Sequence, residues 1–209
     1  MNVREKLPVR RKIPTKSPKG KNWSEHKSDL QEDFHYHCGY CGSYDGFRHT
    51  YFEVDHFVPK SLFEKGRKIK YCQYDNLVYS CKFCNNNKSS KWPSKRISIS
   101  IVNNEGFIDP CDIKFDDHLY RTSDGGILWK SDLGKYFVEQ AFKFDERDYG
   151  IKLLWELNQR RKLLDVFIEE MKKRIPGSKD YNDIEEQAKI ISLEYYTFDK
   201  ELMDYYNSI

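Results

Sequence analysis

The feature that most constrains this chain is a pair of Cys-x-x-Cys motifs, Cys38-Gly39-Tyr40-Cys41 and Cys81-Lys82-Phe83-Cys84. Zinc prefers four tetrahedral ligands, and a two-residue gap lets both thiolates of one motif reach the same ion. A single motif is weak evidence because thioredoxin-like redox proteins also contain it, but no suitable βαβ pattern surrounds either one. We therefore predict one structural zinc ion with four cysteine ligands, namely Cys38, Cys41, Cys81 and Cys84.

The rest of the composition favours a cytoplasmic protein, in which thiols stay reduced. The first residues contain no apolar stretch typical of a secretory signal, and no run approaches the roughly 18 apolar residues of a membrane span. Two further cysteines, Cys72 and Cys111, have no partner at ligand spacing, so we expect them to act as small apolar side chains.

Positive charge is concentrated in the part of the chain that contains both motifs. Residues 1–95 contain 19 Lys and Arg against 10 Asp and Glu, whereas residues 96–149 contain 7 against 11 and residues 150–209 contain 10 against 12. Such a field is typical of proteins that bind a polyanion such as nucleic acid, although ordinary solvated surfaces also carry charge. Residues 1–22, with eight Lys or Arg and three Pro, predict an extended basic arm. This arm would lie along phosphates, dock on a partner or remain a disordered tail.

Between the motifs lies an Asp-His pair, within the segment Val54-Asp55-His56-Phe57-Val58-Pro59. The pair follows a β-prone run over 50–54, and adjacent side chains of a strand point to opposite faces. Asp55 could therefore bind a hard cation on one side while His56 faces a water molecule on the other. Alone, such a pair is more often an ordinary surface or core pair, but Asn76 and Asn85 add oxygen groups from the neighbouring elements.

The expected elements around the motifs are a helix over 25–37, a strand over 50–54, an irregular basic insertion over 60–75, a strand over 76–80 and a helix over 83–91. After Pro93, the alternating Ile97-Ser98-Ile99-Ser100-Ile101 predicts a strand. The turn signal Ser123-Asp124-Gly125-Gly126 predicts a hairpin with strands over 118–122 and 127–130. Helical patterns begin near Asp132 and predict long helices over 148–174 and 180–207.

In this order, the motifs resemble those of the HNH nucleases, whose site has the ββα-metal fold. The residues that match are Cys38 and Cys41, then Val54-Asp55-His56 with Pro59, then Asn76-Leu77, then Cys81, Cys84, Asn85 and Lys88. The resemblance covers residues 35–92 and implies a DNA endonuclease that uses Mg²⁺ or Mn²⁺.

The resemblance also implies a role for each matching residue. His56 would be the general base that deprotonates the attacking water, and Asp55 would bind the catalytic cation. Asn76 would hold the loop after His56 by backbone hydrogen bonds. Asn85 would be the second protein ligand of the cation, and Lys88 would contact phosphate.

Beyond these motifs, we expect Lys60 and Lys91 to bind nucleic acid alongside Lys88. Residues 107–111 and 117–125 resemble bacterial HNH proteins of anti-phage defence, including Septu-type and retron-linked nuclease subunits that act beside an ATPase. They are also consistent with a small β module that merely completes the fold.

Together these features predict an α+β protein with a ββα-metal core stapled by a four-cysteine zinc site. We expect a basic arm over 1–22, the nuclease core over 23–95, a small β extension over 96–131 and a helical region over 132–209. The predicted function is a metal-dependent DNA endonuclease, with a bacterial defence role beside a partner subunit. The alternative is a non-catalytic zinc module that binds nucleic acid or a protein partner.

Overall fold

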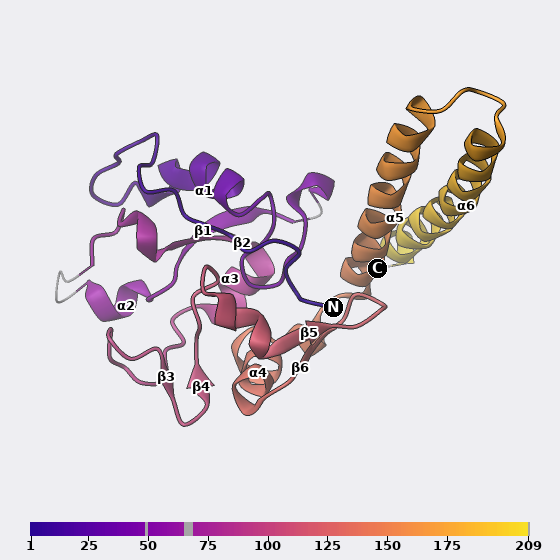
Figure 1. Ribbon diagram of the computed structural model, residues 1–209. Coiled ribbons are helices and arrows are strands. Elements are labelled where there is room, and N and C mark those ends of the chain that lie inside the picture. The colour runs from indigo at the N-terminus through magenta and orange to yellow at the C-terminus, as the bar shows by residue number, and fades with distance from the viewer. Residues whose placement is uncertain (49, 65–68, 209) are drawn as a thin grey trace. The chain divides into compact units, whose positions relative to one another are not determined.

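The structure is a computed structural model that describes residues 1–48, 50–64 and 69–208. It consists of two compact units, Met1–Arg147 and Asp148–Ile209. Helices and small two-stranded sheets both occur, which confirms the predicted α+β class (Figure 1). The predicted segments 1–22, 23–95 and 96–131 all belong to the first unit, and the predicted helical region is divided between the two.

The centre of the first unit is a ββα element. Strand β1 (Phe52–His56) pairs antiparallel with β2 (Leu77–Cys81), from Phe52 opposite Cys81 to His56 opposite Leu77. Helix α3 (Lys82–Lys88) follows β2 directly. Every residue of β2 is buried, which fits its Leu-Val-Tyr sequence and a strand covered on both faces. The predicted order of strand, strand and helix is therefore present (Figure 1).

Upstream of the first cysteine motif lie a 3₁₀ turn, η1 (Trp23–His26), and helix α1 (Lys27–Asp33). This helical stretch ends earlier than the predicted 25–37. His35 and Tyr36 have φ values of 53° and 61°, and a helix cannot continue through consecutive left-handed residues.

The insertion between β1 and β2 is less irregular than predicted. It begins with one helical turn, α2 (Lys60–Phe63), and ends with a 3₁₀ turn, η3 (Tyr74–Asn76). The part of the prediction that falls on residues 65–68 lies outside the described residues.

The β extension contains two short hairpins. The first joins β3 (Ile101–Val102) to β4 (Glu105–Gly106), and the second joins β5 (Leu119–Arg121) to β6 (Ile127–Trp129). A 3₁₀ turn, η4 (Ile113–Asp117), lies between them. The second hairpin matches the turn signal in the sequence.

The strand predicted over 97–101 is wrong except for its last residue. Local bonds take both backbone groups of Ile99, whose N–H donates to the carbonyl of Arg96 at 3.2 Å. The hydroxyl of Ser94 donates to the carbonyl of Ile99 and accepts from the N–H of Arg96, while the indole of Trp92 donates to the carbonyl of Arg96 at 2.9 Å.

An aromatic core joins the ββα element to the extension. After β6 the chain forms α4 (Asp132–Tyr136), a π turn η5 (Phe137–Ala141) and a 3₁₀ turn η6 (Phe144–Glu146). The ring of Phe107 stacks on Trp92 with centroids 5.8 Å apart and contacts Phe142 edge-on at 5.6 Å. Buried rings of this kind remove large apolar areas from water.

The second unit is a pair of helices, α5 (Tyr149–Lys172) and α6 (Lys179–Ser208), close to the predicted 148–174 and 180–207. The side chain of Asp148 caps α5 by accepting from the N–H of Gly150 at 2.7 Å. Arg160 bonds Glu194 across the pair, and Tyr149 donates to Glu201. None of the described helices has the length and apolar character needed to cross a membrane.

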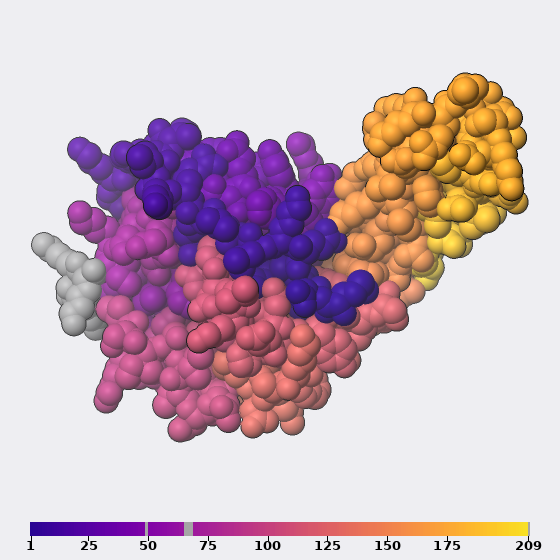
Figure 2. Space-filling model, in the orientation of Figure 1, coloured from indigo at the N-terminus to yellow at the C-terminus, as the bar shows by residue number. Residues whose placement is uncertain are grey.

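The N-terminal arm packs on the first unit and, in Figure 2, spreads over one face of it. Its arginines point inward: Arg4 pairs with Asp116 at 2.7 Å, and Arg10 pairs with Asp109 at 3.0 Å and donates to the carbonyl of Leu77. Its lysines are exposed, namely Lys6, Lys12, Lys16, Lys19 and Lys21. The arm is thus part of the folded unit, and its arginines are engaged within the protein.

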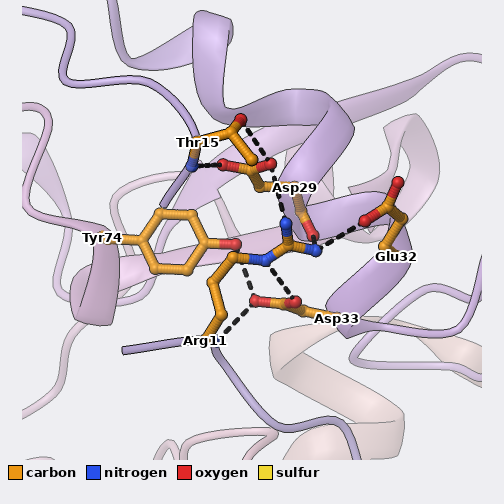
Figure 3. A network of polar contacts seen from close by, with 6 residues as sticks. All are labelled: Arg11, Thr15, Asp29, Glu32, Asp33 and Tyr74. Carbon is orange, nitrogen blue, oxygen red and sulfur yellow. Dashed lines mark hydrogen bonds and ion pairs between the residues drawn. The ribbon is translucent and has the colours of Figure 1, made fainter. Parts of the chain in front are cut away.

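Arg11 is the centre of the densest polar network of the arm (Figure 3). Its guanidinium donates to Asp29 at 3.0 Å, Asp33 at 2.8 Å and Glu32 at 2.7 Å, all on α1. Asp29 also accepts from the backbone and hydroxyl of Thr15 (Figure 3). The network fastens the arm to α1, the helix that leads into the first cysteine motif.

We expect Arg11→Ala to lower the free energy of unfolding by about 2 kcal/mol. Removing one partner of a buried ion pair costs about 3–5 kcal/mol, and the cost is reduced here because Arg11 keeps 24% of its side chain exposed. Urea unfolding measures the change. The matched control is Lys12→Ala, an exposed arm cation that should change stability by less than about 0.5 kcal/mol. Equal midpoints for the two variants would contradict an anchoring role for Arg11.

Candidate functional site

The chemically distinctive residues meet at one cavity of about 860 Å³ in the first unit. Glu53, Asp55 and His56 reach it from β1, Asn85 reaches it from α3, and Trp23 lines it from η1. The antiparallel pairing of β1 and β2, with α3 directly after β2, brings Glu53 and Asn85 together although they are 32 residues apart.

Asp55 is almost buried, with 7% of its surface exposed. Its Oδ2 accepts from the hydroxyl of Tyr40 at 2.6 Å and lies 3.0 Å from the Nζ of Lys88. Burial, followed by the nearby Asp55 carboxylate, raises the pKa of Tyr40 well above its usual value, so the phenol stays a donor. No hydrogen bond to Oδ1 of Asp55 occurs within the described residues, which leaves that oxygen for another ligand.

Lys88 is fully buried, with 0% of its surface exposed. Its ammonium donates to the backbone carbonyl of His56 at 2.7 Å and pairs with Asp55. The predicted contact between Lys88 and phosphate does not fit this placement, because a side chain without exposed surface cannot reach a substrate. The resemblance identified Lys88 as part of the site, but it carries no information on how deeply the side chain is buried.

His56 is held in a defined orientation and protonation state. Its Nε2 lies 2.8 Å from the carbonyl oxygen of Tyr71. A carbonyl can only accept, so Nε2 carries the hydrogen and Nδ1 keeps a free lone pair. Burial lowers the pKa of His56, and the hydrogen bond to Tyr71 and the charge of Asp55 offset only part of that effect. The imidazole is therefore neutral at neutral pH and can accept a proton at Nδ1.

Trp23 supports the His56 ring from its side. The two ring centroids are 5.0 Å apart with an interplanar angle of 67°, and Trp23 also stacks on Tyr71 at 5.8 Å. The Nζ of Lys60 lies 4.5 Å from the Trp23 ring centre. Lys60 is exposed and lines the cavity, so its charge is available to a ligand there.

Asn76 fastens the chain that follows His56. Its side-chain Oδ1 accepts from the N–H of Val58 at 2.9 Å, its Nδ2 donates to the carbonyl of Val58 at 3.2 Å, and its own carbonyl accepts from the N–H of Phe57. A side-chain amide that bonds both backbone groups of one residue fixes the local path of the chain.

Asn85 and Asn86 line the cavity, whereas Asn87 donates to the carbonyl of Phe83 within its own helix. The Nδ2 of Asn85 donates to Oε2 of Glu53 at 2.6 Å. Its Oδ1 accepts no hydrogen bond from any residue that the structure describes. Asp55 and Asn85 therefore each present one unbonded oxygen to the same cavity, a donor set that suits a hard divalent cation.

The four cysteines form a second centre. Cys38, Cys41, Cys81 and Cys84 are all buried, and their sulfur atoms lie within 4.8 Å of one another. The separation of 3.8 Å between the sulfurs of Cys41 and Cys81 equals the edge of a tetrahedron with metal–sulfur bonds of about 2.3 Å. This geometry fits one metal ion with four thiolate ligands.

Two arginines lie against the cysteine centre. Arg147 donates to the hydroxyl of Ser43 at 2.8 Å; burial lowers its pKa, but the thiols of the four cysteines outweigh that effect and raise it. Arg121 donates to the carbonyl of Cys41 at 2.5 Å, and burial lowers its pKa to about 10. These cations would offset the negative charge of four thiolates that hold a metal ion.

The ammonium of Lys91 donates to the carbonyls of Gln140 and Ala141 at 2.6 Å and 3.0 Å. Lys91 thus holds the segment after α4, and its expected contact with nucleic acid stays a prediction. Sequence reasoning also missed Trp23, Tyr40, Tyr71 and Glu53. Of these residues, only Glu53 could have been identified from the sequence. It precedes Asp55 by two positions, and a strand directs side chains at that spacing to the same face.

Comparison with known proteins agrees with this arrangement. The family model described as HNH endonuclease matches residues 38–91, the stretch that contains both cysteine motifs, β1, β2 and α3. No curated protein and no solved structure matches the chain. Residues 38–91 of this chain are therefore similar to an HNH endonuclease domain.

Proposed function

We propose that this protein is a metal-dependent endonuclease that hydrolyses phosphodiester bonds in DNA. The observation that carries the proposal is the orientation of His56, whose neutral imidazole has a free Nδ1 at a cavity that Asp55 and Asn85 also line. A binding module would not need a buried histidine with a fixed tautomer beside two unbonded oxygens.

In the proposed reaction, Nδ1 of His56 takes a proton from the attacking water, and the carbonyl of Tyr71 stabilises the resulting imidazolium through Nε2–H. Asp55 and Asn85 would hold Mg²⁺ or Mn²⁺ through one oxygen each. When bound, such an ion relieves the charge on the phosphate and stabilises the departing oxygen. Asn76 keeps the segment after His56 in position.

Three further features support DNA as the substrate. Lys27 and Lys60 line the cavity and can neutralise phosphate oxygens. The lysines of the arm are exposed, so their charge is available to phosphates. The match to an endonuclease family covers the whole ββα element.

For the cysteine centre we propose zinc, because four thiolates in a tetrahedral arrangement select that ion. Reduced thiols of this kind are typical of the cytoplasm, where we expect the protein to act. A defence role beside an ATPase partner is supported only by the resemblance of residues 107–111 and 117–125 to anti-phage HNH proteins.

The first test is cleavage of plasmid DNA with Mg²⁺ or Mn²⁺, with and without EDTA. His56→Ala should lower the rate by about 10²–10⁴-fold, the usual contribution of a general base, while zinc content and DNA binding persist. The control is His118→Ala, whose Nδ1 bonds the hydroxyl of Ser131 in the extension and which should cut like the wild type. Wild-type rates in His56→Ala would remove His56 as the base. A chain that binds DNA but never cuts it would favour the non-catalytic zinc module.

The second prediction concerns pH. The base acts in its neutral form, so cleavage should rise with pH through the pKa of His56 and then level off. Burial holds that pKa below the ordinary value of 6.5, so the midpoint should lie below 6.5. Single-turnover rates between about pH 5 and pH 8 measure it. A midpoint above 6.5 would contradict the burial of a neutral imidazole.

The third prediction concerns the cysteine centre. Cys81→Ala should release zinc and abolish cooperative thermal unfolding, because a structural zinc ion contributes about 10–16 kcal/mol in small zinc domains. Cys72→Ala is the control, since Cys72 lies outside the cluster. Metal analysis and calorimetry report both changes. Normal zinc content and stability in Cys81→Ala would exclude a zinc staple.

A further inference from the structure

We propose that Glu53 is a positioning residue of the cation site, which orients the Asn85 amide so that its oxygen faces the ion and supplies negative charge beside it. The inference rests on the proposed function, because it concerns how the catalytic cation is held. Glu53 is part of β1, and its Oε2 accepts from Nδ2 of Asn85 at 2.6 Å.

The first argument concerns orientation. The oxygen and nitrogen of an asparagine amide have nearly the same shape, and only the oxygen can bind a cation. The carboxylate of Glu53 can only accept, so it selects the orientation in which Nδ2 faces Glu53. The opposite orientation would place two acceptors against each other and would turn the Asn85 N–H groups toward the ion.

The second argument concerns charge. The carboxylate of Asp55 is already paired with Lys88, whose ammonium is fully buried, and Asn85 is neutral. Glu64 also lines the cavity, but it is exposed and accepts from the hydroxyl of Tyr71. Glu53 forms no ion pair with any described residue. Its negative charge, next to the Asn85 amide, would therefore add to that of Asp55 in stabilising a divalent cation.

A double-mutant cycle tests the proposal by calorimetric titration of Mn²⁺ into the zinc-loaded, full-length protein. We expect E53Q to weaken Mn²⁺ binding by about 10- to 100-fold, the usual effect of removing a group that orients a metal ligand. Glutamine can present either its oxygen or its nitrogen to Asn85, so neither orientation of the amide is selected. E64Q is the matched control, and it should bind within about twofold of the wild type.

The second arm of the cycle uses N85D, whose carboxylate offers an oxygen in either orientation. In that background E53Q should weaken Mn²⁺ binding less than it does in the wild-type background, because no amide remains to be oriented and only the charge of Glu53 is lost. Unchanged zinc content and thermal midpoint identify variants that remain folded.

Two results would overturn the inference alone. One is Mn²⁺ binding by E53Q at the wild-type affinity. The other is an equal loss of Mn²⁺ affinity from E53Q in both backgrounds, which would mean that Glu53 does not act by orienting the Asn85 amide. Absence of Mn²⁺ binding in the wild type, or its persistence in D55A at full affinity, would instead overturn the cation site itself and the role of Glu53 with it.

Discussion

The buried ammonium of Lys88 is the contact on which the arrangement of the site depends. It joins the end of α3 to the end of β1 by bonding both the Asp55 carboxylate and the His56 carbonyl. A charge without exposed surface is tolerated only when its partners are in place, so this contact fixes the helix against the strand. Asn85 lies one helical turn before Lys88 and is carried to the cavity by the same constraint.

The cysteine centre lies at the start of α3, whereas Lys88 lies at the end of that helix. Cys81 is the last residue of β2 and Cys84 lies in the first turn of α3, so a metal bound there would fix the turn between strand and helix. Arg121 of the extension and Arg147, which follows η6, bring two charges to this centre. The extension therefore belongs to the structural support of the ββα element, which fits the interpretation of this segment as a small β module that completes the fold.

Spacing along the chain predicted the residues whose chemistry requires a fixed separation. The two Cys-x-x-Cys motifs and the strand that ends in Asp55-His56 were identifiable because ligand geometry and strand alternation are local. How deeply a side chain is buried depends on the whole fold and not on its neighbours in the sequence. The sequence therefore predicts a phosphate contact for Lys88, although this residue lies in the core. Trp23 could not be predicted as a neighbour of His56, since only the folded chain brings η1 to the cavity.

The division of the arm into inward arginines and outward lysines changes how its charge counts toward DNA binding. Neutralising phosphates releases the counterions condensed on DNA, and the number released sets how steeply affinity falls with salt. Arg4, Arg10 and Arg11 are already neutralised by carboxylates of the same molecule and would release none. Only the five exposed lysines of the arm remain to do so. The salt sensitivity of this protein should therefore be smaller than its eight basic arm residues suggest.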